Sequence, residues 1–69
     1  MKILQISLAA ARVNAGLTQE DVARKLCVSK RTIINWEKGR VIPSVATVSA
    51  LATLYNISED NIFLPQKST

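Results

Sequence analysis

The sequence of 69 residues contains no histidine and only one cysteine, Cys27. A single thiol cannot form an internal disulfide, and no cysteines or carboxylates have metal-ligand spacing, so we expect no structural zinc. A nucleophilic role for Cys27 is not expected either, because no histidine is present to activate its thiol. Since a glycine-rich phosphate loop is also missing, we predict that the protein is not an enzyme and binds no cofactor, metal or small-molecule ligand.

Long hydrophobic runs are missing as well. Nothing approaches the roughly 20 apolar residues that a membrane-spanning helix needs. The stretch ILQISLAAA near the N-terminus is similar to the apolar part of a signal peptide, but Gln5 and Ser7 interrupt it and it continues in helical phase. A lone thiol is typical of a reducing compartment. We therefore expect a cytoplasmic protein with no membrane contact.

The length predicts one small domain. Such a domain buries only about 60% of its unfolded surface, and self-association is one way for it to gain stability. We expect the domain to span residues 1–64 and to be followed by a flexible tail over 65–69. The net charge is +4 at pH 7 and the pI is about 9.7. This charge favours a polyanionic partner without identifying it.

Residues 18–39 predict two short helices joined by a tight turn. Thr18 and Ser29 are suited to cap the two N-termini, and apolar residues recur at helical spacing after each. Gly39 is suited to end the second helix. Cys27 lies in the turn, where a left-handed backbone costs a residue with a Cβ about 1 kcal/mol. Helices of about two turns cannot bury themselves, so neighbours must fix their angle. This arrangement is typical of a helix-turn-helix unit.

The second of these helices has an outward stripe that is rich in cations and amides. Its members are Lys30, Arg31, Ile34, Asn35 and Lys38. Six of the nine basic residues lie between positions 24 and 40, where Glu37 is the only acid. A cationic stripe by itself is usually a solvated face. On the second helix of a helix-turn-helix, however, it is presented to the major groove of DNA, and we interpret it in that way.

A preceding helix is predicted over residues 3–14, with Gly16 just after its end. Its predicted core face consists of Leu4, Leu8, Ala11, Arg12 and Ala15. Arg12 is the one charge on this face, and Glu37 is the one charge on the inner face of the later helix. We predict that they form a partly buried ion pair. The alternative is that Arg12 only lies along the edge of the core with its charge in water.

The opposite face of this predicted helix is apolar as well, and it consists of Ile3, Ile6, Ala10 and Val13. A helix that is apolar nearly all round is normally buried on both sides. Two interpretations stay open. The C-terminal part of the chain covers this face, or the face is an interface for a second subunit or another partner.

Pro43 and Ser44 predict a further helix over residues 44–55. Its predicted inward face consists of Val45, Val48, Leu51, Ala52 and Tyr55. Asn56 is suited to follow its end, and Ser58 is suited to open a short fifth helix that ends near Leu64. Ile57, Ile62 and Phe63 are expected to close the core. The sequence thus predicts a compact all-α fold of five helices, with the helix-turn-helix in the second and third.

The sequence resembles the lambda-repressor/Cro-like (XRE-type) helix-turn-helix domains of bacterial and phage regulators. The residues that carry the resemblance are Gly16-Leu17-Thr18-Gln19-Glu20, Val22-Ala23-Arg24-Lys25-Leu26, Val28-Ser29, Thr32-Ile33, Trp36-Glu37-Lys38-Gly39-Arg40, Pro43-Ser44 and Ile57-Ser58. The resemblance implies phosphate contacts by Gln19 and Arg40, groove contacts by Ser29, Lys30, Arg31 and Asn35, and a structural ion pair of Arg12 with Glu37. To these we add Ile34, which is suited to touch a thymine methyl group, and Lys38 as a phosphate contact.

Two features depart from the family pattern. Cys27 stands where the family usually has a turn glycine, and the first predicted helix lacks the family's customary basic residues. We predict a small bacterial or phage transcriptional regulator, and favour a repressor, that binds double-stranded DNA as a homodimer on an inverted-repeat operator. The alternative is an antitoxin-like or other protein-interaction subunit that uses the apolar outer face of the first helix.

Overall fold

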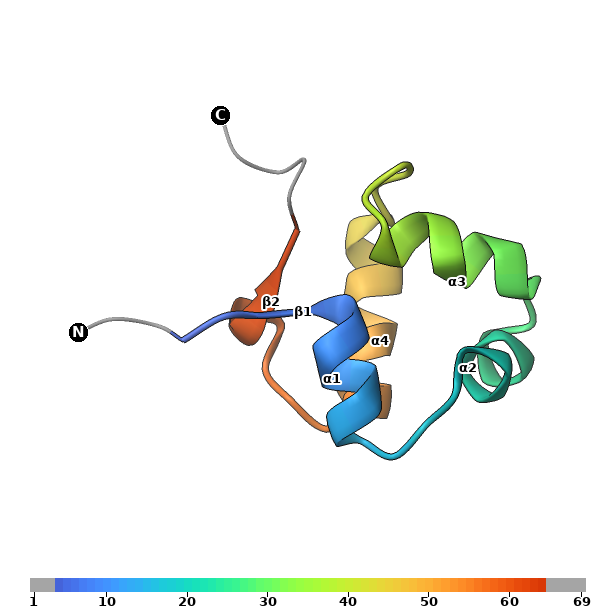
Figure 1. The fold of residues 1–69 in the computed structure, drawn as a ribbon. Helices are drawn as coiled ribbons and strands as arrows, with labels where there is room; N and C mark the ends of the chain where they lie inside the picture. Colours follow the sequence, from blue (N-terminus) through green and yellow to red (C-terminus); the bar gives the residue numbers. More distant parts are fainter. Residues whose placement is uncertain (1–3, 65–69) are drawn as a thin grey trace.

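The computed structural model describes residues 4–64, which form a small helical bundle with a short sheet at one side (Figure 1). The elements in chain order are β1 (Ile6–Ser7), α1 (Leu8–Asn14), α2 (Gln19–Leu26), α3 (Lys30–Glu37), α4 (Val45–Tyr55), the single-turn 3-10 helix η1 (Glu59–Asn61) and β2 (Ile62–Phe63). The described residues thus contain four α-helices and not the five that we predicted. The predicted tail over 65–69 and the N-terminal residues 1–3 lie outside the described residues.

A hydroxyl side chain caps the N-terminus of each α-helix. Ser7, Thr18, Ser29 and Ser44 each accept a hydrogen bond from the backbone N–H three residues further on. At α2 the cap is reciprocal, because the Thr18 N–H also donates to Asp21 Oδ2 at 2.9 Å. The predicted caps at Thr18, Ser29 and Ser44 are confirmed, and Ser7 was missed.

Each α-helix is followed by a residue whose backbone has the left-handed conformation. Cys27 and Asn56 have φ of 58° and follow α2 and α4, and Gly16 and Gly39 have φ of 75° and 76° after α1 and α3. The positions predicted for Cys27 and Asn56 are therefore confirmed. Glycine and asparagine tolerate this backbone conformation well, whereas the Cβ of Cys27 is strained in it.

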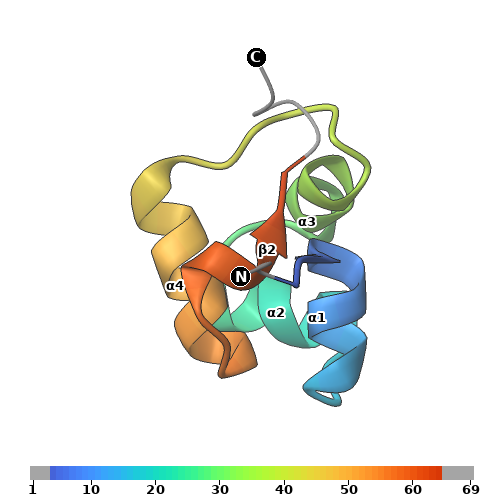
Figure 2. The same ribbon diagram turned by 90° about the vertical axis from the view of Figure 1, so that its left-hand side faces the viewer.

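The first helix begins at Leu8 and not at Ile3. Ile6 lies in β1, which pairs in parallel with β2 in the register Ile6 to Ile62 and Ser7 to Phe63. Since Ser7 caps α1, its backbone must be extended, and this excludes helix before it. The segment predicted as a fifth helix accordingly becomes η1 and β2, because residues 62–63 supply the partner strand. Figure 2 shows β2 between α4 on one side and α1 and α3 on the other.

The buried core combines residues of all four helices and β2: Leu8, Ala11, Val22, Ala23, Ile33, Val48, Leu51, Ala52, Tyr55 and Ile62. Several residues that we predicted to be inside are exposed, namely Leu4 (80%), Ala15, Val45 (82%) and Phe63. Leu4 precedes the helix, and Ala15 follows the last turn of α1. Val45 is the first residue of α4, and Phe63 points to the opposite side of β2 from Ile62. No helix within residues 4–64 is long and apolar enough to cross a membrane.

Candidate nucleic-acid interface

The turn over residues 27–29 joins α2 to α3, and these two helices pack against each other on one side of the bundle (Figure 1). Val22 and Ala23 of α2 and Ile33 of α3 are buried in the shared core, and Trp36 packs against it. The inner sides of the two helices therefore fix their relative orientation. The opposite side of α3 is left at the surface, as a helix-turn-helix requires.

The side chains predicted to contact bases lie along this outer side of α3. Ser29, Lys30 and Arg31 are exposed at its N-terminal end, and Ile34 and Asn35 are half-buried one turn later. Ser29 is also the N-cap, since its Oγ accepts from the Thr32 N–H at 3.2 Å and lies 3.0 Å from Thr32 Oγ1. The structure thus brings the five residues together on one surface, while their roles in binding remain predictions.

The two cations after α3 differ in their surroundings. Lys38 is exposed at the C-cap, and no hydrogen bond is found for its ammonium group within residues 4–64. Arg40 is tied to Asn35, because its backbone N–H donates to the Asn35 carbonyl at 2.9 Å and its Nη1 lies 3.5 Å from Asn35 Oδ1. The amide nitrogen of Asn35 stays available as a donor. Both cations lie just after the last residue of α3.

A polar network fixes the inner end of α3 to α1 and α2. Arg12 Nε donates to Glu37 Oε2 at 2.7 Å, and Arg12 Nη2 reaches Glu37 Oε1 at 3.4 Å. The side chains are 15% and 7% exposed, so the predicted partly buried ion pair is confirmed. The Arg12 Nη1 also donates to the Leu17 carbonyl at 2.9 Å. Each polar hydrogen-bonding group of the pair therefore has a partner, as a buried charge requires.

Gln19 belongs to the same network, which the sequence did not reveal. Its Nε2 donates to Glu37 Oε1 at 3.0 Å. Because an amide nitrogen carries two hydrogens, the second one remains free to bind a phosphate oxygen. Gln19 also lines a surface hollow together with Arg12, Thr18, Glu20 and Lys30. The sequence could not reveal this hydrogen bond, because Glu37 lies 18 residues after Gln19. From its position at the start of a helix, Gln19 could be expected only to contact a phosphate outside the protein.

Two pKa values are shifted by this architecture. The Thr18 hydrogen bonds lower the pKa of Asp21, and the nearby Arg24 guanidinium lowers it further. Burial raises the pKa of Tyr55 to about 12, with a further increase from the Glu37 charge and an opposing effect of Arg12. Residues 4–64 also hold no cluster of three or more histidine, cysteine or acidic side chains that could bind a metal ion.

Comparison with known proteins agrees with this geometry. Residues 8–62 match the protein-family model described as Helix-turn-helix. The chain belongs to the XRE-type helix-turn-helix family. The resemblance predicted from the sequence is thereby confirmed, and the matched segment covers α1 through the start of β2. This family is one of transcription regulators whose helix-turn-helix binds DNA, and its domains are not typically enzymatic.

Individual relatives carry the same description. The chain is 44% identical over 49 residues to the uncharacterized HTH-type transcriptional regulator MJ0272 of Methanocaldococcus jannaschii, covering 71% of this chain and 74% of that protein. It is 38% identical over 53 residues to the HTH-type transcriptional regulator ImmR of Bacillus subtilis, covering 77% and 42% of the two proteins. It is 41% identical over 46 residues to the cryptic phage CTXphi transcriptional repressor RstR of Vibrio cholerae, covering 67% and 41%. No solved structure matches this chain.

Proposed function

We propose that this helix-turn-helix protein binds specific sequences of double-stranded DNA by inserting α3 into the major groove. The observation that carries the proposal is the division of α3 into two sides. Ile33 on one side is buried in the core, whereas Lys30 and Arg31 are exposed on the other. A helix held in this way fixes the backbone positions from which these donors would reach base edges.

Each outward side chain suits a particular contact. Lys30 and Arg31 can donate to O6 and N7 of guanine, and the free amide hydrogens of Asn35 suit N7 of adenine or another groove acceptor. Ile34 would touch a thymine methyl group, and Ser29 caps the N-terminal end of α3, which would enter the groove first. These residues would select the sequence.

Three further side chains would position the protein on the DNA backbone. Gln19 has one amide hydrogen free beside the N-terminus of α2, a favourable place for a phosphate oxygen. Lys38 and Arg40 follow α3 and carry positive charges at its other end. Contacts of this kind supply affinity that depends on salt and little on sequence.

We further propose that the protein acts as a repressor by occupying its site, as a pair of copies on an inverted repeat. The repressor role is supported by the relative RstR, which is named a transcriptional repressor. An antitoxin-like or other protein-interaction role is the alternative. It is less well supported, because Ile6 of the expected partner face pairs with β2 and is partly buried. Ala10 is also half-buried, Val13 is exposed, and Ile3 lies outside the described residues.

The first experiment is selection of binders from a random duplex library at near-physiological salt, followed by sequencing. An enriched inverted repeat with fixed spacing supports the proposal and yields the operator, whose position relative to a promoter can then be tested for repression. Absence of enrichment from a folded sample would overturn sequence-specific binding.

Two variants then separate the proposed roles. Arg31→Ala should relax the preference at one base position by about 1–3 kcal/mol, whereas Arg40→Ala should weaken binding to all sequences alike. Lys25→Ala is the matched control, because it removes the same charge from an exposed position near the C-terminus of α2. Equal losses on every DNA for Arg31→Ala and Arg40→Ala would contradict the assignment of Arg31 to base contacts.

A further inference from the structure

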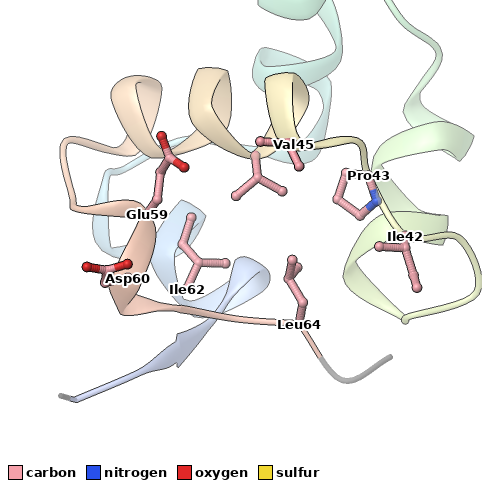
Figure 3. Close-up of a pocket in the computed structure, with 8 residues that line it drawn as sticks. Ile42, Pro43, Val45, Glu59, Asp60, Ile62 and Leu64 are labelled. Carbon is pink, nitrogen blue, oxygen red and sulfur yellow. The ribbon is translucent and has the colours of Figure 1, made fainter. Parts of the chain in front are cut away.

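An apolar groove with an acidic end shares no lining residue with the proposed DNA-binding surface. It has a volume of about 290 Å³, and six of its lining residues are apolar: Ile42, Pro43, Val45, Val48, Ile62 and Leu64. The two remaining lining residues are Glu59 and Asp60. Figure 3 shows these two acids at one end of the groove and Ile42 and Pro43 at the other. The groove therefore changes from apolar to acidic along its length.

The apolar part of the groove is only partly shielded within residues 4–64. Val48 and Ile62 belong to the buried core, whereas Val45 is 82% exposed and Ile42 is 50% exposed. Single exposed hydrophobic residues are ordinary, but several beside one apolar hollow indicate a surface that another molecule covers. Because core residues form part of the lining, that part of the groove exists before anything binds, as in most sites for small molecules.

The size of the groove favours a small molecule over a macromolecule. Pockets for small ligands have volumes of about 300–1,000 Å³, and they are mostly apolar with a few polar groups that fix the orientation of the ligand. This groove lies at the lower end of that range, so it suits one ring or a short alkyl chain. A standard protein interface involves roughly 20–30 residues a side, which eight lining residues do not reach.

The charges at one end indicate the chemical class of the small molecule. The ion pairs found within residues 4–64 join Arg12 to Glu37 and Arg24 to Asp21, and they leave out the carboxylates at the groove. The chain carries a net charge of +4, yet two of its five acidic residues, Glu59 and Asp60, are consecutive at this end. Carboxylates accept hydrogen bonds, and an ammonium group donates three. The groove is therefore complementary to an apolar molecule with a cationic head.

We propose that this groove binds a small hydrophobic amine. Its apolar body would lie against Val45, Ile62 and Leu64, and its ammonium group would lie at Glu59 and Asp60. Both acids are exposed, so the ammonium group keeps part of its hydration and the cost of removing it from water is small. The apolar body supplies most of the affinity, and the carboxylates set the orientation. The site does not rest on the proposed function, so failure of either proposal leaves the other standing.

Phenylbutylamine is a suitable probe, because an alkyl ammonium group with a pKa of about 10.4 is charged at pH 7. In backbone amide NMR of the full chain, the shifts that it causes should be concentrated in residues 42–48 and 59–64. A ligand of about ten non-hydrogen atoms with ordinary efficiency should bind with a Kd on the order of 1 mM. The neutral phenylbutanol should bind about 3–10-fold more weakly, because it lacks the two ionic contacts, and the anionic phenylbutanoate more weakly still.

The acidic end is tested with a double variant, Glu59→Gln with Asp60→Asn, which keeps the side-chain shapes and removes both charges. It should bind the amine and the alcohol alike. Glu20→Gln is the matched control, because Glu20 is an exposed acid in the first turn of α2 and does not line the groove. This control should keep the full preference for the amine. The dispersion of the amide signals verifies that each variant is folded.

The apolar wall is tested with Val45→Thr, which replaces one methyl group with a hydroxyl group of similar size. It should weaken the amine and the alcohol by the same factor, about 2–4-fold, because less apolar surface is buried. Val13→Thr is the matched control, since Val13 is an exposed valine in α1 (62%) and lies outside the groove. It should bind both probes as the parent does.

Four results would overturn the proposal. The first is that the amine moves no amide signal of the groove at concentrations up to about 10 mM, well above the expected Kd. The second is equal binding of amine and alcohol by the parent, and the third is loss of the preference in Glu20→Gln. The fourth is that groove signals change with protein concentration alone and do not respond to the amine, because a second copy would then cover the groove.

Discussion

Removing the partly buried Arg12 side chain should destabilise this protein strongly. Arg12→Met keeps much of the apolar volume of the side chain but takes away the cation that faces Glu37 at 2.7 Å. Glu37 is only 7% exposed, so its charge cannot be hydrated in place. The same substitution leaves the Leu17 carbonyl without its donor. Helix α1 then loses its side-chain hydrogen bonds to α3 and to the segment before α2, while the Leu17 N–H still donates to the Arg12 carbonyl at 3.2 Å.

The magnitude follows from this burial. Removing one member of a buried ion pair costs about 3–5 kcal/mol, because the remaining charge is uncompensated. We expect the lower part of this range, since Glu37 would still accept the hydrogen bond of Gln19 at 3.0 Å. A chain of 69 residues has a total stability of roughly 3–10 kcal/mol. Arg12→Met should therefore lose a large fraction of the total stability.

A double-mutant cycle with Glu37→Gln measures the interaction itself. The neutral partner removes the unpaired charge, so the double variant should recover part of the loss, with a coupling energy of about 1–3 kcal/mol. Urea unfolding can be followed by the fluorescence of Trp36, the single tryptophan, which packs against the core. The dependence of the unfolding free energy on urea should be unchanged among the four proteins if all unfold in two states.

A coupling energy within about 0.3 kcal/mol of zero would refute this reasoning, because distant independent sites are additive to that degree. It would mean that Arg12 stabilises the fold only through its hydrocarbon part and the Leu17 carbonyl. A loss of stability in Arg12→Met below about 1 kcal/mol would refute it as well, since that is the range of exposed ion pairs.

Three further predictions concern single residues. Tyr55, the only tyrosine, should ionise at about pH 12 in the folded protein. Because this pKa is above the ordinary value of 10.0, the stability that the buried neutral phenol contributes is complete below pH 10 and is lost as the pH rises through 12. Phenolate absorbance measures the pH at which half of Tyr55 is ionised, and a midpoint near 10 in folded protein would contradict the burial argument. The Tyr55→Phe variant should lose less stability than the parent over this pH range. Cys27→Gly should stabilise the protein by about 1 kcal/mol in thermal unfolding, because φ is 58° there; Cys27→Ala is the control, and an equal gain in both would exclude backbone strain as the cause. Thr18→Ala should lower the free energy of unfolding by about 1 kcal/mol, because it removes the cap of α2. Urea unfolding measures the loss, and Thr53→Ala at an exposed position in α4 is the control. Equal stability of the two variants would mean that the capping box adds nothing.

The family and the helix-turn-helix could be predicted because their signals are local. The caps at Thr18 and Ser29 act on backbone groups three residues away. The ion pair was predictable as well, although 25 residues separate its members, because each was the one charge on an otherwise apolar face. A buried charge needs a partner, and the sequence offered a single candidate for each.

The two ends of the domain could not be predicted in the same way. The apolar spacing of residues 3–14 suits a helix, yet Ile6 lies in a strand because residues 62–63 supply a parallel partner from the other end of the chain. Side-chain amides strengthen this junction, as Asn61 Nδ2 donates to the Leu4 carbonyl at 2.7 Å and Gln5 Nε2 to the Asp60 carbonyl at 3.2 Å. Pairing between positions more than 50 residues apart has no local sequence signal.

The sequence by itself determined where the helices from Thr18 to Tyr55 begin and end, and which side of α3 carries the cations, because capping, left-handed residues and helical spacing act within a few residues. Only the tertiary structure decided that the chain ends form a sheet, that Gln19 joins the ion pair, and that Ile42, Val45 and Leu64 line one groove. Those features depend on distances between elements, which are set when the whole core packs and not by any one segment.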